Sequence, residues 1–382
     1  MRISAFPHHC ESRGFTAPTL VARCVHGLEA TVAAEILQRG LGVVTHLGHR
    51  EVHFRTDDSR AQVTGLRTAD DVFLLAAQCQ DTGTAKQSGG ALARLADAAD
   101  LGELTRLREA HGGSSAVTGV EVSASFLGRR NFNRYDVEDA VGQALARRLG
   151  VDYHSRRAGT APPAGYGGWR VTLDGTRATL MLRVADRPLH RRPYKRCSVP
   201  GTLHPPLAAA MARMAGIRPG DTVLDPCCGA GTLLIEAARQ QPQARLYGVD
   251  LDVRALSAAE ENTAGLPVAL GRADAGRLPF ADGGVHCVLS NPPWGGQVAA
   301  RGLLSASSVH WWTELRRVLA PGGTAVVLLP DADGVATAIE RRLAPVHVQR
   351  VRISGAQSFL VRLTAPGGHG RRPSGKGTAA QP

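Results

Sequence analysis

The sequence predicts an α/β protein whose C-terminal half forms a doubly wound, mostly parallel sheet with an antiparallel edge hairpin. Two observations support this class. From residue 206 onward, short apolar runs typical of strands alternate with amphipathic helix patterns, as in successive βαβ units. The last two strand patterns, 346–353 and 358–364, have no helix between them and should pair as a hairpin. The residues before 206 have shorter, mixed patterns that predict smaller α+β units.

Two such α+β units are expected in the N-terminal half. In the first, residues 29–37 form a helix pattern that places Val32, Ile36 and Leu37 on one face. Its other elements are expected as strands at 20–24 and 52–55 and as a helix at 70–78. In the second unit, residues 135–149 form the helix pattern. Its strands are expected at 117–125, 169–173 and 178–184, the last two as a hairpin.

The C-terminal half opens with a helix pattern after Pro205 and Pro206, which are tolerated in a first helical turn. The elements that follow are strands at 222–224, 246–249, 268–270, 285–290 and 324–329, and helices at 232–239, 255–264 and 309–319. Ligands of open α/β sheets bind at the carboxyl ends of the strands, so the residues that follow each strand are the first candidates for a site.

We therefore divide the chain into an extension, two α+β domains, a linker, an α/β domain and a tail, at 1–17, 18–86, 87–196, 197–205, 206–365 and 366–382. The extension and the tail are expected to be disordered, since they hold too few apolar residues for a core. No stretch is long and apolar enough to cross a membrane, and the start lacks the features of a signal peptide. We expect a cytoplasmic protein.

Charge and cysteine content indicate the class of partner. The chain has 45 Lys and Arg residues against 33 Asp and Glu, a formal net charge of +12, which favours a polyanionic partner. Residues 129–196 hold 15 basic and 6 acidic residues, so this stretch contributes +9 of the +12. It is either a phosphate-contacting face or a solvated surface with a compositional bias. The 7 cysteines have no CxxC spacing, so we expect neither a disulfide framework nor a metal site.

A glycine-rich turn directly follows the strand at 222–224. Its sequence is DPCCGAGT, residues 225–232, and its glycines allow a tight turn and the close approach of a ligand before a helix N-terminus. A third glycine of a dinucleotide fingerprint would fall at Leu234, which weakens a nicotinamide interpretation. Asp250 ends the next strand, where a carboxylate can accept ribose hydroxyls or cap a helix. Asp274 follows the third strand, as an adenine-amine acceptor or as an ordinary loop aspartate.

The motif NPPW, residues 291–294, follows the strand at 285–290. Its two prolines lack backbone donors and have a fixed φ, so carbonyl oxygens can point into a pocket. The Asn291 amide and a backbone carbonyl could both accept hydrogen bonds from one NH2 group, while the Trp294 ring stacks on the base that carries it. This pattern favours chemistry on a planar amine.

Taken together, DPCCGAGT, GVD at 248–250 and NPPW resemble the amino-methyltransferases of the Rossmann-like S-adenosylmethionine class. The resemblance implies that Asp225 binds the methionine amine, Asp250 the ribose, and Leu251, Asp274 and Ala275 the adenine. The cofactor-binding set that it implies is Asp225, Cys227, Gly229, Gly231, Asp250, Leu251, Asp274, Ala275 and Asn291. The catalytic set that it implies is Asn291, Pro292, Pro293 and Trp294. Tyr or Phe is commoner than Trp at the last position of the family signature.

Stretches outside these motifs resemble a narrower group. Residues 27–37 and 66–77 are similar to the N-terminal ferredoxin-like domain of THUMP-containing RNA methyltransferases, and residues 187–216 to the junction between THUMP and catalytic domains. The resemblance implies a ferredoxin-like domain at 18–86, a THUMP RNA-binding domain at 87–196 and a Rossmann-like methyltransferase domain at 206–365. The candidate phosphate contacts are Arg187, Arg191, Arg192, Lys195 and Arg196.

The family implies S-adenosyl-L-methionine as cofactor and the exocyclic N2 amine of a guanosine in tRNA, in or near the acceptor stem, as target. The alternatives are a guanosine in ribosomal RNA, another amine in a DNA base or a protein glutamine, and a non-catalytic RNA-binding protein. No obligate protein partner is expected.

Overall fold

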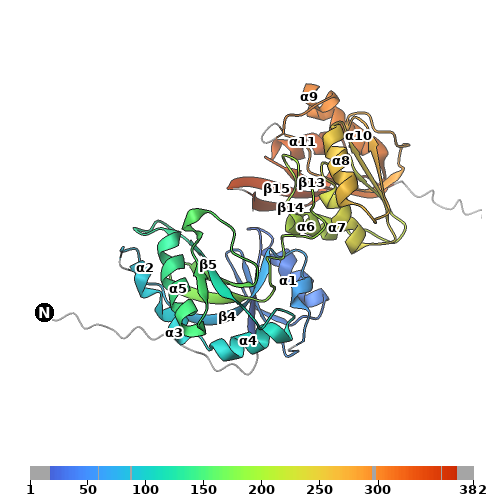
Figure 1. The fold of residues 1–382 in the computed structure, drawn as a ribbon. Helices are drawn as coiled ribbons and strands as arrows, with labels where there is room; N and C mark the ends of the chain where they lie inside the picture. The colour runs from blue at the N-terminus through green and yellow to red at the C-terminus, as the bar shows by residue number, and fades with distance from the viewer. Residues whose placement is uncertain (1–17, 59, 87, 295–297, 354, 368–382) are drawn as a thin grey trace, which may run out of the picture. The chain divides into compact units, whose positions relative to one another are not determined.

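The computed structural model describes residues 18–58, 60–86, 88–294, 298–353 and 355–367 (Figure 1). The chain divides into two compact units after Arg192, and each has its own sheet. The predicted extension and residues 368–382 of the predicted tail lie outside the described residues. The predicted linker, 197–205, belongs to the second unit, which begins at Pro193.

The first unit contains one eight-stranded sheet with the strand order β2-β3-β1-β4-β8-β7-β5-β6. The strands are β1 (Thr19–Arg23), β2 (Val43–Gly48), β3 (Glu51–Arg55), β4 (Asp71–Gln80), β5 (Gly119–Phe126), β6 (Asp152–His154), β7 (Tyr166–Leu173) and β8 (Arg177–Arg183). The α-helices are α1 (Glu29–Gln38), α2 (Ser88–Ala91), α3 (Arg94–Ala98), α4 (Leu101–Ala110) and α5 (Arg134–Leu149), with short 3-10 turns at Val63–Gly65 and Arg156–Ala158 (Figure 1).

The two α+β units predicted from the sequence share this one sheet. β4 belongs to the first and β8 to the second, and they pair antiparallel from Phe73↔Arg183 to Gln80↔Arg177. The boundary predicted after residue 86 therefore falls inside a unit whose sheet is continuous. The hairpin predicted for 169–173 and 178–184 is confirmed, because β7 and β8 pair antiparallel.

Two predictions for this unit are wrong. The stretch 70–78, predicted as a helix, is the strand β4, which pairs with β1 on one side and β8 on the other. Val72, Phe73 and Leu74 are buried in succession, and a continuous apolar run of this length fits a central strand as well as a helix. Leu37 does not face the core, because it is 58 % exposed, whereas Val32 and Ile36 are fully buried on the inner face of α1.

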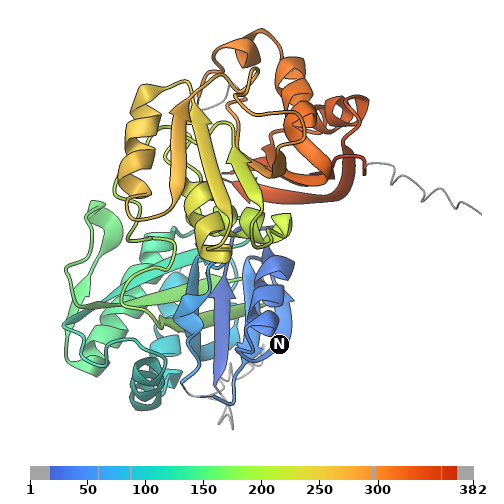
Figure 2. The same cartoon turned by 90° about the vertical axis from the view of Figure 1, so that its right-hand side faces the viewer.

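The second unit contains a seven-stranded sheet with the order β11-β10-β9-β12-β13-β15-β14. The strands are β9 (Thr222–Asp225), β10 (Arg245–Asp250), β11 (Val268–Arg272), β12 (Val285–Ser290), β13 (Leu319–Leu329), β14 (Ala344–Ile353) and β15 (Ala356–Thr364). The strands from β11 to β13 run parallel, and β15 is antiparallel to both β13 and β14. Figure 2 shows the parallel strands side by side. The predicted doubly wound sheet with an antiparallel edge hairpin is confirmed.

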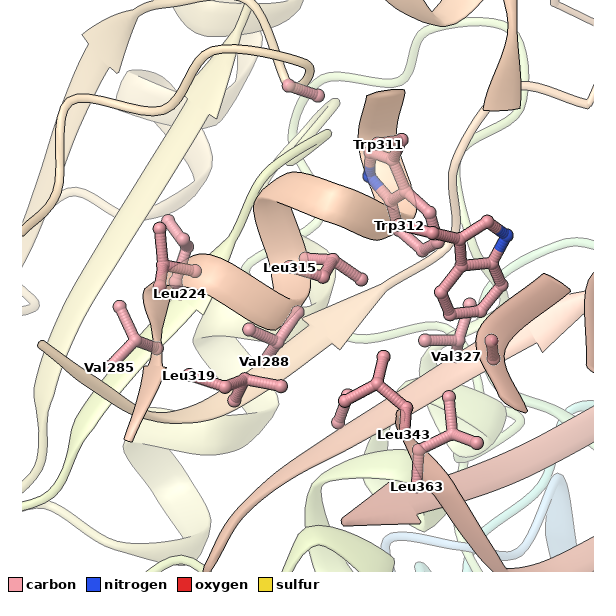
Figure 3. Packing of buried hydrophobic residues seen from close by; sticks show 14 of the residues in the cluster. Leu224, Val285, Val288, Trp311, Trp312, Leu315, Leu319, Val327, Leu343 and Leu363 are labelled. Atoms are coloured by element: carbon pink, nitrogen blue, oxygen red, sulfur yellow. The ribbon is translucent and has the colours of Figure 1, made fainter. Parts of the chain in front are cut away.

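Helices connect the strands of this sheet, and their bounds are α6 (Pro205–Ala215), α7 (Thr232–Gln240), α8 (Val253–Asn262), α9 (Leu303–Ala306), α10 (Ser308–Val318) and α11 (Asp333–Glu340). Two of them, α9 and α11, were not predicted. α10 contributes Trp311 and Trp312, both fully buried, to a core that also contains Leu224, Val288 and Val327 from three parallel strands (Figure 3). This core supports β9 and β12, the two strands whose ends carry the predicted motifs.

Candidate active site

The predicted site residues lie at the carboxyl ends of four adjacent strands. Asp225 is the last residue of β9 and Asp250 the last of β10, while Asp274 and Asn291 follow β11 and β12. β9 lies between β10 and β12, and the chain winds outward in both directions from this point. A crevice forms at such a switch point of a parallel sheet, because neighbouring connections leave on opposite faces. The fold therefore gathers the motifs, which span almost 70 residues of sequence, at one edge.

The turn at 225–232 depends on glycine at two positions. Gly229 and Gly231 have φ of +50° and +78°, a region that residues with a Cβ rarely adopt. Gly231 is also the N-cap of α7, and a Cβ added there would lie 3.1 Å from Thr263 Cγ2. The Cys228 N–H donates to the Val249 carbonyl over 3.0 Å, which ties the turn to the neighbouring strand. The turn is thus held against the end of β10.

Asp250 holds this turn with both carboxylate oxygens. One oxygen accepts from the Gly229 N–H and the other from the Asp252 N–H, each over 2.9 Å. The alternative that Asp250 only caps a helix does not hold, because Asp252 is the N-cap of α8 and accepts from the Arg254 N–H. Each oxygen of Asp250 retains a second lone pair for a ligand hydroxyl. The residue can therefore shape the turn and bind a ligand at once.

Asp225 is the carboxyl group of this site whose pKa is shifted. Its side chain is 1 % exposed, and burial raises its pKa to about 8. The nearby charge of Asp250 also raises the pKa, whereas a hydrogen bond from the Cys227 N–H, 3.1 Å long, lowers it. None of the ion pairs found among the described residues involves Asp225. A buried carboxyl in this state favours a cationic ligand, since a nearby positive charge stabilises its ionised form.

Asp274 is held by two backbone N–H groups, from Gly276 at 2.8 Å and from Leu303 at 2.9 Å. Gly302, with φ of +60°, passes directly over this carboxylate: a Cβ there would lie 2.1 Å from Asp274 Oδ2 and 2.7 Å from Leu251 Cδ1. Asp274 therefore joins the end of β11 to the start of α9. The same segment covers Leu251, so two residues of the predicted adenine site lie together beneath it.

The NPPW motif is anchored at both ends. The Asn291 Nδ2 donates to the Gly201 carbonyl over 3.3 Å, which leaves Oδ1 as the acceptor of this amide. The Trp294 Nε1–H donates to the Leu328 carbonyl over 3.0 Å, and its ring meets Trp311 edge-on with centroids 5.6 Å apart. The indole is thus fixed by its polar edge. Residues 295–297, which follow the motif, lie outside the described residues.

Sequence reasoning missed the residues that support these groups. Gly201 and Leu328 act through backbone carbonyls, which no side-chain pattern reveals. Gly302 could have been noticed as a glycine shortly after the NPPW motif, but its contact with Asp274 depends on the fold. Among the other predicted cofactor residues, Ala275 is buried in the core, and burial raises the pKa of the Cys227 thiol well above its usual range, so that thiol stays uncharged.

The five predicted phosphate contacts differ in exposure. Arg187, Arg191 and Arg196 are exposed. Arg192 is half-buried and donates through Nη2 to the Arg67 carbonyl over 2.8 Å, so part of its guanidinium is used inside the protein. Lys195 is half-buried, and burial lowers its pKa. The three exposed arginines are the stronger candidates for contact with a polyanion.

The count of basic residues between 129 and 196 overstates the charge that solvent meets. Several of these arginines form ion pairs with acidic residues that lie outside that window in sequence. The pairs are Arg130–Asp81 at 2.6 Å, Arg183–Asp71 at 2.6 Å and Arg156–Glu121 at 3.1 Å. Tertiary contacts therefore neutralise part of an excess that a sequence window counts as unpaired.

Among the described residues, no cluster of three or more His, Cys, Asp or Glu side chains could hold a metal ion. No described helix combines the length and the apolar character that crossing a membrane requires.

Comparisons with known proteins agree with the geometry of the second unit. Residues 192–358 match the family described as UPF0020, RMKL-like, methyltransferase domain. The chain is 36 % identical over 215 residues to a tRNA (guanine(6)-N2)-methyltransferase of Thermus thermophilus, covering 54 % of this chain and 61 % of that protein. It is 30 % identical over 178 residues to a tRNA (guanine(10)-N2)-dimethyltransferase of Methanothermobacter thermautotrophicus, covering 46 % and 51 %. The aligned regions thus span about half the length of these curated relatives.

Likeness to solved structures extends over both units. The crystal structure of TrmN from Thermus thermophilus has a TM-score of 0.70 and 29 % identity, covering 91 % of this chain and 99 % of that one. SMU.472, solved in complex with SAH, has a TM-score of 0.66 at 17 % identity, covering 92 % and 98 %, and this likeness concerns the fold alone. The second unit therefore has a Rossmann-like methyltransferase fold, as predicted.

Proposed function

We propose that this chain is an S-adenosylmethionine-dependent RNA methyltransferase that methylates the exocyclic N2 amine of a guanosine, with tRNA as the preferred substrate. The observation that carries the proposal is the position of NPPW at the end of β12, next to the strand that ends in Asp225. Asn291 Oδ1 and the Pro292 carbonyl can accept the two protons of one amine there. The relatives named as guanine-N2-methyltransferases support guanosine as the target.

The residues of the glycine turn fit the cofactor. The buried Asp225 carboxyl suits a cationic amine, and Asp250 has lone pairs left for ribose hydroxyls. Leu251, Asp274 and Ala275 would surround the adenine. When bound, S-adenosylmethionine supplies an electrophilic methyl group. The fit depends on the buried Asp225 carboxyl, whose ionised form a cationic ligand would stabilise and a neutral or anionic ligand would not.

The protein's part in catalysis is to position the amine and to stabilise charge. A base must leave its stack to reach the pocket. Acceptance of both amine protons by Asn291 and Pro292 would raise the electron density on nitrogen and stabilise the positive charge that develops there in the transition state. Trp294, fixed by Leu328 and Trp311, offers a ring face for the base. Holding both reactants in line supplies the rest of the rate enhancement.

We infer that the first unit contacts the RNA, with a ferredoxin-like part at 18–86 and a THUMP part beginning at 87. The support is the sequence resemblance, together with the exposed arginines near the end of β8. A ribosomal RNA target is the main alternative. A relative from Bos taurus, 28 % identical over 248 residues covering 61 % of this chain and 45 % of that protein, is named a U6 snRNA (guanine-N(2))-methyltransferase, which shows that relatives differ in the RNA they modify.

Mass spectrometry of nucleosides tests the proposal. The gene is disrupted, and modified nucleosides are compared in purified tRNA and ribosomal RNA, with the wild-type gene restored as the control. Loss of N2-methylguanosine from tRNA alone supports the proposal. Loss of N2-methylguanosine from ribosomal RNA alone would identify ribosomal RNA as the substrate instead. Unchanged RNA, together with methylation of DNA or protein by the purified chain, contradicts it.

The affinity for S-adenosylmethionine should depend on pH. Below pH 8, the Asp225 carboxyl of the free protein holds a proton that must leave when a cationic amine binds, so affinity should rise about tenfold per pH unit between pH 6 and 7. Above about pH 8, the α-amine of the cofactor loses its own proton and affinity should fall. Isothermal titration calorimetry in buffers of different ionisation enthalpy would show the proton release.

Asp225→Asn provides the control for this pH dependence. The variant should bind weakly and should lose the rise in affinity between pH 6 and 8, because the amide has no proton to release. A wild-type affinity that does not change over this range would contradict the assignment of Asp225 to the amine.

RNA binding should depend on salt through the exposed arginines. Replacing Arg187, Arg191 and Arg196 together with alanine should lower the slope of log K against log salt by about two to three, because each phosphate contact contributes roughly 0.7 to 0.9. Affinity for the cofactor should stay unchanged. Filter binding at several salt concentrations measures the slope. Arg106→Ala, which removes an exposed arginine paired with Glu103 on α4, is the matched control and should leave the slope unaltered.

A further inference from the structure

Asn262, the last residue of α8, makes four hydrogen bonds through its side-chain amide. It is 5 % exposed. Its Oδ1 accepts from the backbone N–H groups of Arg196 and Cys197 over 2.9 and 3.0 Å. Its Nδ2 donates to the carbonyls of Cys197 and Ala230 over 2.9 and 3.0 Å. A side-chain amide has two donor hydrogens and two lone pairs, so this group is fully used.

The hydrogen bond to Ala230 joins the end of α8 to the glycine turn. Ala230 lies between Gly229 and Gly231 and is 2 % exposed, so its carbonyl has little access to water. The end of α8 packs closely on the same turn, since a Cβ at Gly231 would lie 3.1 Å from Thr263 and 3.4 Å from Ala259. Asp250 holds the turn from the β10 side, and Asn262 holds it from the α8 side. Both contacts act on the loop that is proposed to receive the methionine part of the cofactor.

The contacts with 196 and 197 bring a second segment to the same place. These residues follow the start of the second unit and precede α6. Tyr194, in the same segment, is anchored separately, because its hydroxyl donates to Glu236 of α7 over 2.6 Å. One amide therefore links this segment to the glycine turn, while the hydroxyl of Tyr194 links the same segment to Glu236 on α7.

We propose that Asn262 is a positioning residue for the cofactor turn: it fixes the Ala230 carbonyl and so the conformation of Gly229 and Gly231 that S-adenosylmethionine requires. The inference rests on the proposed cofactor site. Removal of the amide leaves a buried carbonyl without its protein partner, which destabilises the present conformation of the turn relative to others. A loss of cofactor affinity follows, with a smaller effect on turnover once cofactor saturates the enzyme.

The test compares three variants of the full chain by isothermal titration calorimetry with S-adenosylmethionine. Asn262→Ala removes all four hydrogen bonds. Asn262→Asp keeps an acceptor for the N–H groups of 196 and 197 but has no amide donor for the carbonyls of Cys197 and Ala230. Tyr194→Phe removes the hydrogen bond from the same segment to Glu236. We expect the two Asn262 variants to bind about tenfold more weakly than wild type, and Tyr194→Phe to stay within about twofold. Asn262→Asp covers the case in which Asn262→Ala fails to fold.

Thermal unfolding of each variant separates positioning from general destabilisation. The proposal requires that the Asn262 variants lose affinity for S-adenosylmethionine and that Tyr194→Phe does not, when the variants have lost similar amounts of melting temperature. In methylation assays, Asn262→Ala should raise KM for the cofactor while kcat stays within about threefold. Equal losses of affinity in Tyr194→Phe and Asn262→Ala, or wild-type affinity in both Asn262 variants, would overturn it.

Failure of the proposed function can be distinguished from failure of the proposal for Asn262. If wild-type protein binds S-adenosylmethionine but methylates no RNA, the substrate assignment falls and the comparison of affinities still decides the role of Asn262. If wild-type protein binds no S-adenosylmethionine, the cofactor assignment and the role of Asn262 fall together.

Discussion

Replacing Asn291 with alanine should reduce RNA methylation by about 100-fold or more while affinity for S-adenosylmethionine stays within about twofold. The Asn291 Nδ2 is used by the Gly201 carbonyl, so Oδ1 is the atom that can accept a proton of the target amine. Loss of one such group, aimed at charge that develops in the transition state, typically costs about 100- to 1000-fold in rate. Because Asn291 is proposed to contact mainly the target amine, its loss should change the affinity for the cofactor in the ground state little.

Two variants make this experiment specific. Asn291→Asp keeps an acceptor oxygen and should retain more activity than the alanine variant. Ser290→Ala changes the preceding residue, whose buried hydroxyl has no hydrogen-bond partner among the described residues, and should stay within about threefold of wild type. The measurement is single-turnover methyl transfer to purified tRNA, with calorimetry for the cofactor. Full turnover by Asn291→Ala would remove the NPPW motif from the mechanism.

Replacing Asp250 with alanine should weaken the binding of S-adenosylmethionine by about 100-fold. Asp250 accepts the N–H groups of Gly229 and Asp252, so its loss frees the glycine turn as well as removing the acceptor proposed for the ribose. Hydrogen bonds to a charged group contribute about 1.5 to 3 kcal/mol each, so the loss of one alone corresponds to a factor of about 10 to 150. Asp250→Asn keeps the shape of the side chain and should have an intermediate effect.

Asp252→Ala is the matched control for this prediction. Asp252 is two residues away, caps α8 and pairs with Arg301 at 3.3 Å, so its loss should cost about 1 kcal/mol of stability. Among the described residues, its carboxylate bonds to Arg254 and Arg301 and to no residue of the glycine turn, so affinity for the cofactor should stay within about threefold. Equilibrium dialysis with labelled cofactor measures both variants. Equal affinities for the two alanine variants would contradict the special role of Asp250.

Much of the second unit could be predicted because its pattern is local. Each strand is a short apolar run followed by a helix pattern, and the connections are too short to allow many topologies. The motifs at 225–232 and 291–294 follow strands, so their common position at one sheet edge comes directly from the parallel order. The edge hairpin was equally predictable, since no helix pattern separates its strands.

The first unit was predicted less well because its elements depend on distant partners. The apolar run in β4 fits a helix or a central strand, and only pairing with β1 and β8 decides between them. The same pairing merges the two predicted α+β units into one sheet. The charge of the basic stretch was also misjudged, because Asp71, Asp81 and Glu121 approach its arginines only in the folded chain.

Residue order alone therefore determined the class of the second unit, the strand ends that carry the candidate site, and the side chains that we propose as acceptors for an amine. These features follow from periodicity and from motifs whose members are close in sequence. Tertiary structure decided which groups hold the site in place: the carbonyls of Gly201 and Leu328 bind the Asn291 and Trp294 side chains, the Leu303 N–H binds Asp274, and the Asn262 amide binds the backbone of the glycine turn. Their partners lie between 29 and 90 residues away, and backbone atoms, which every residue has, leave no trace in a sequence.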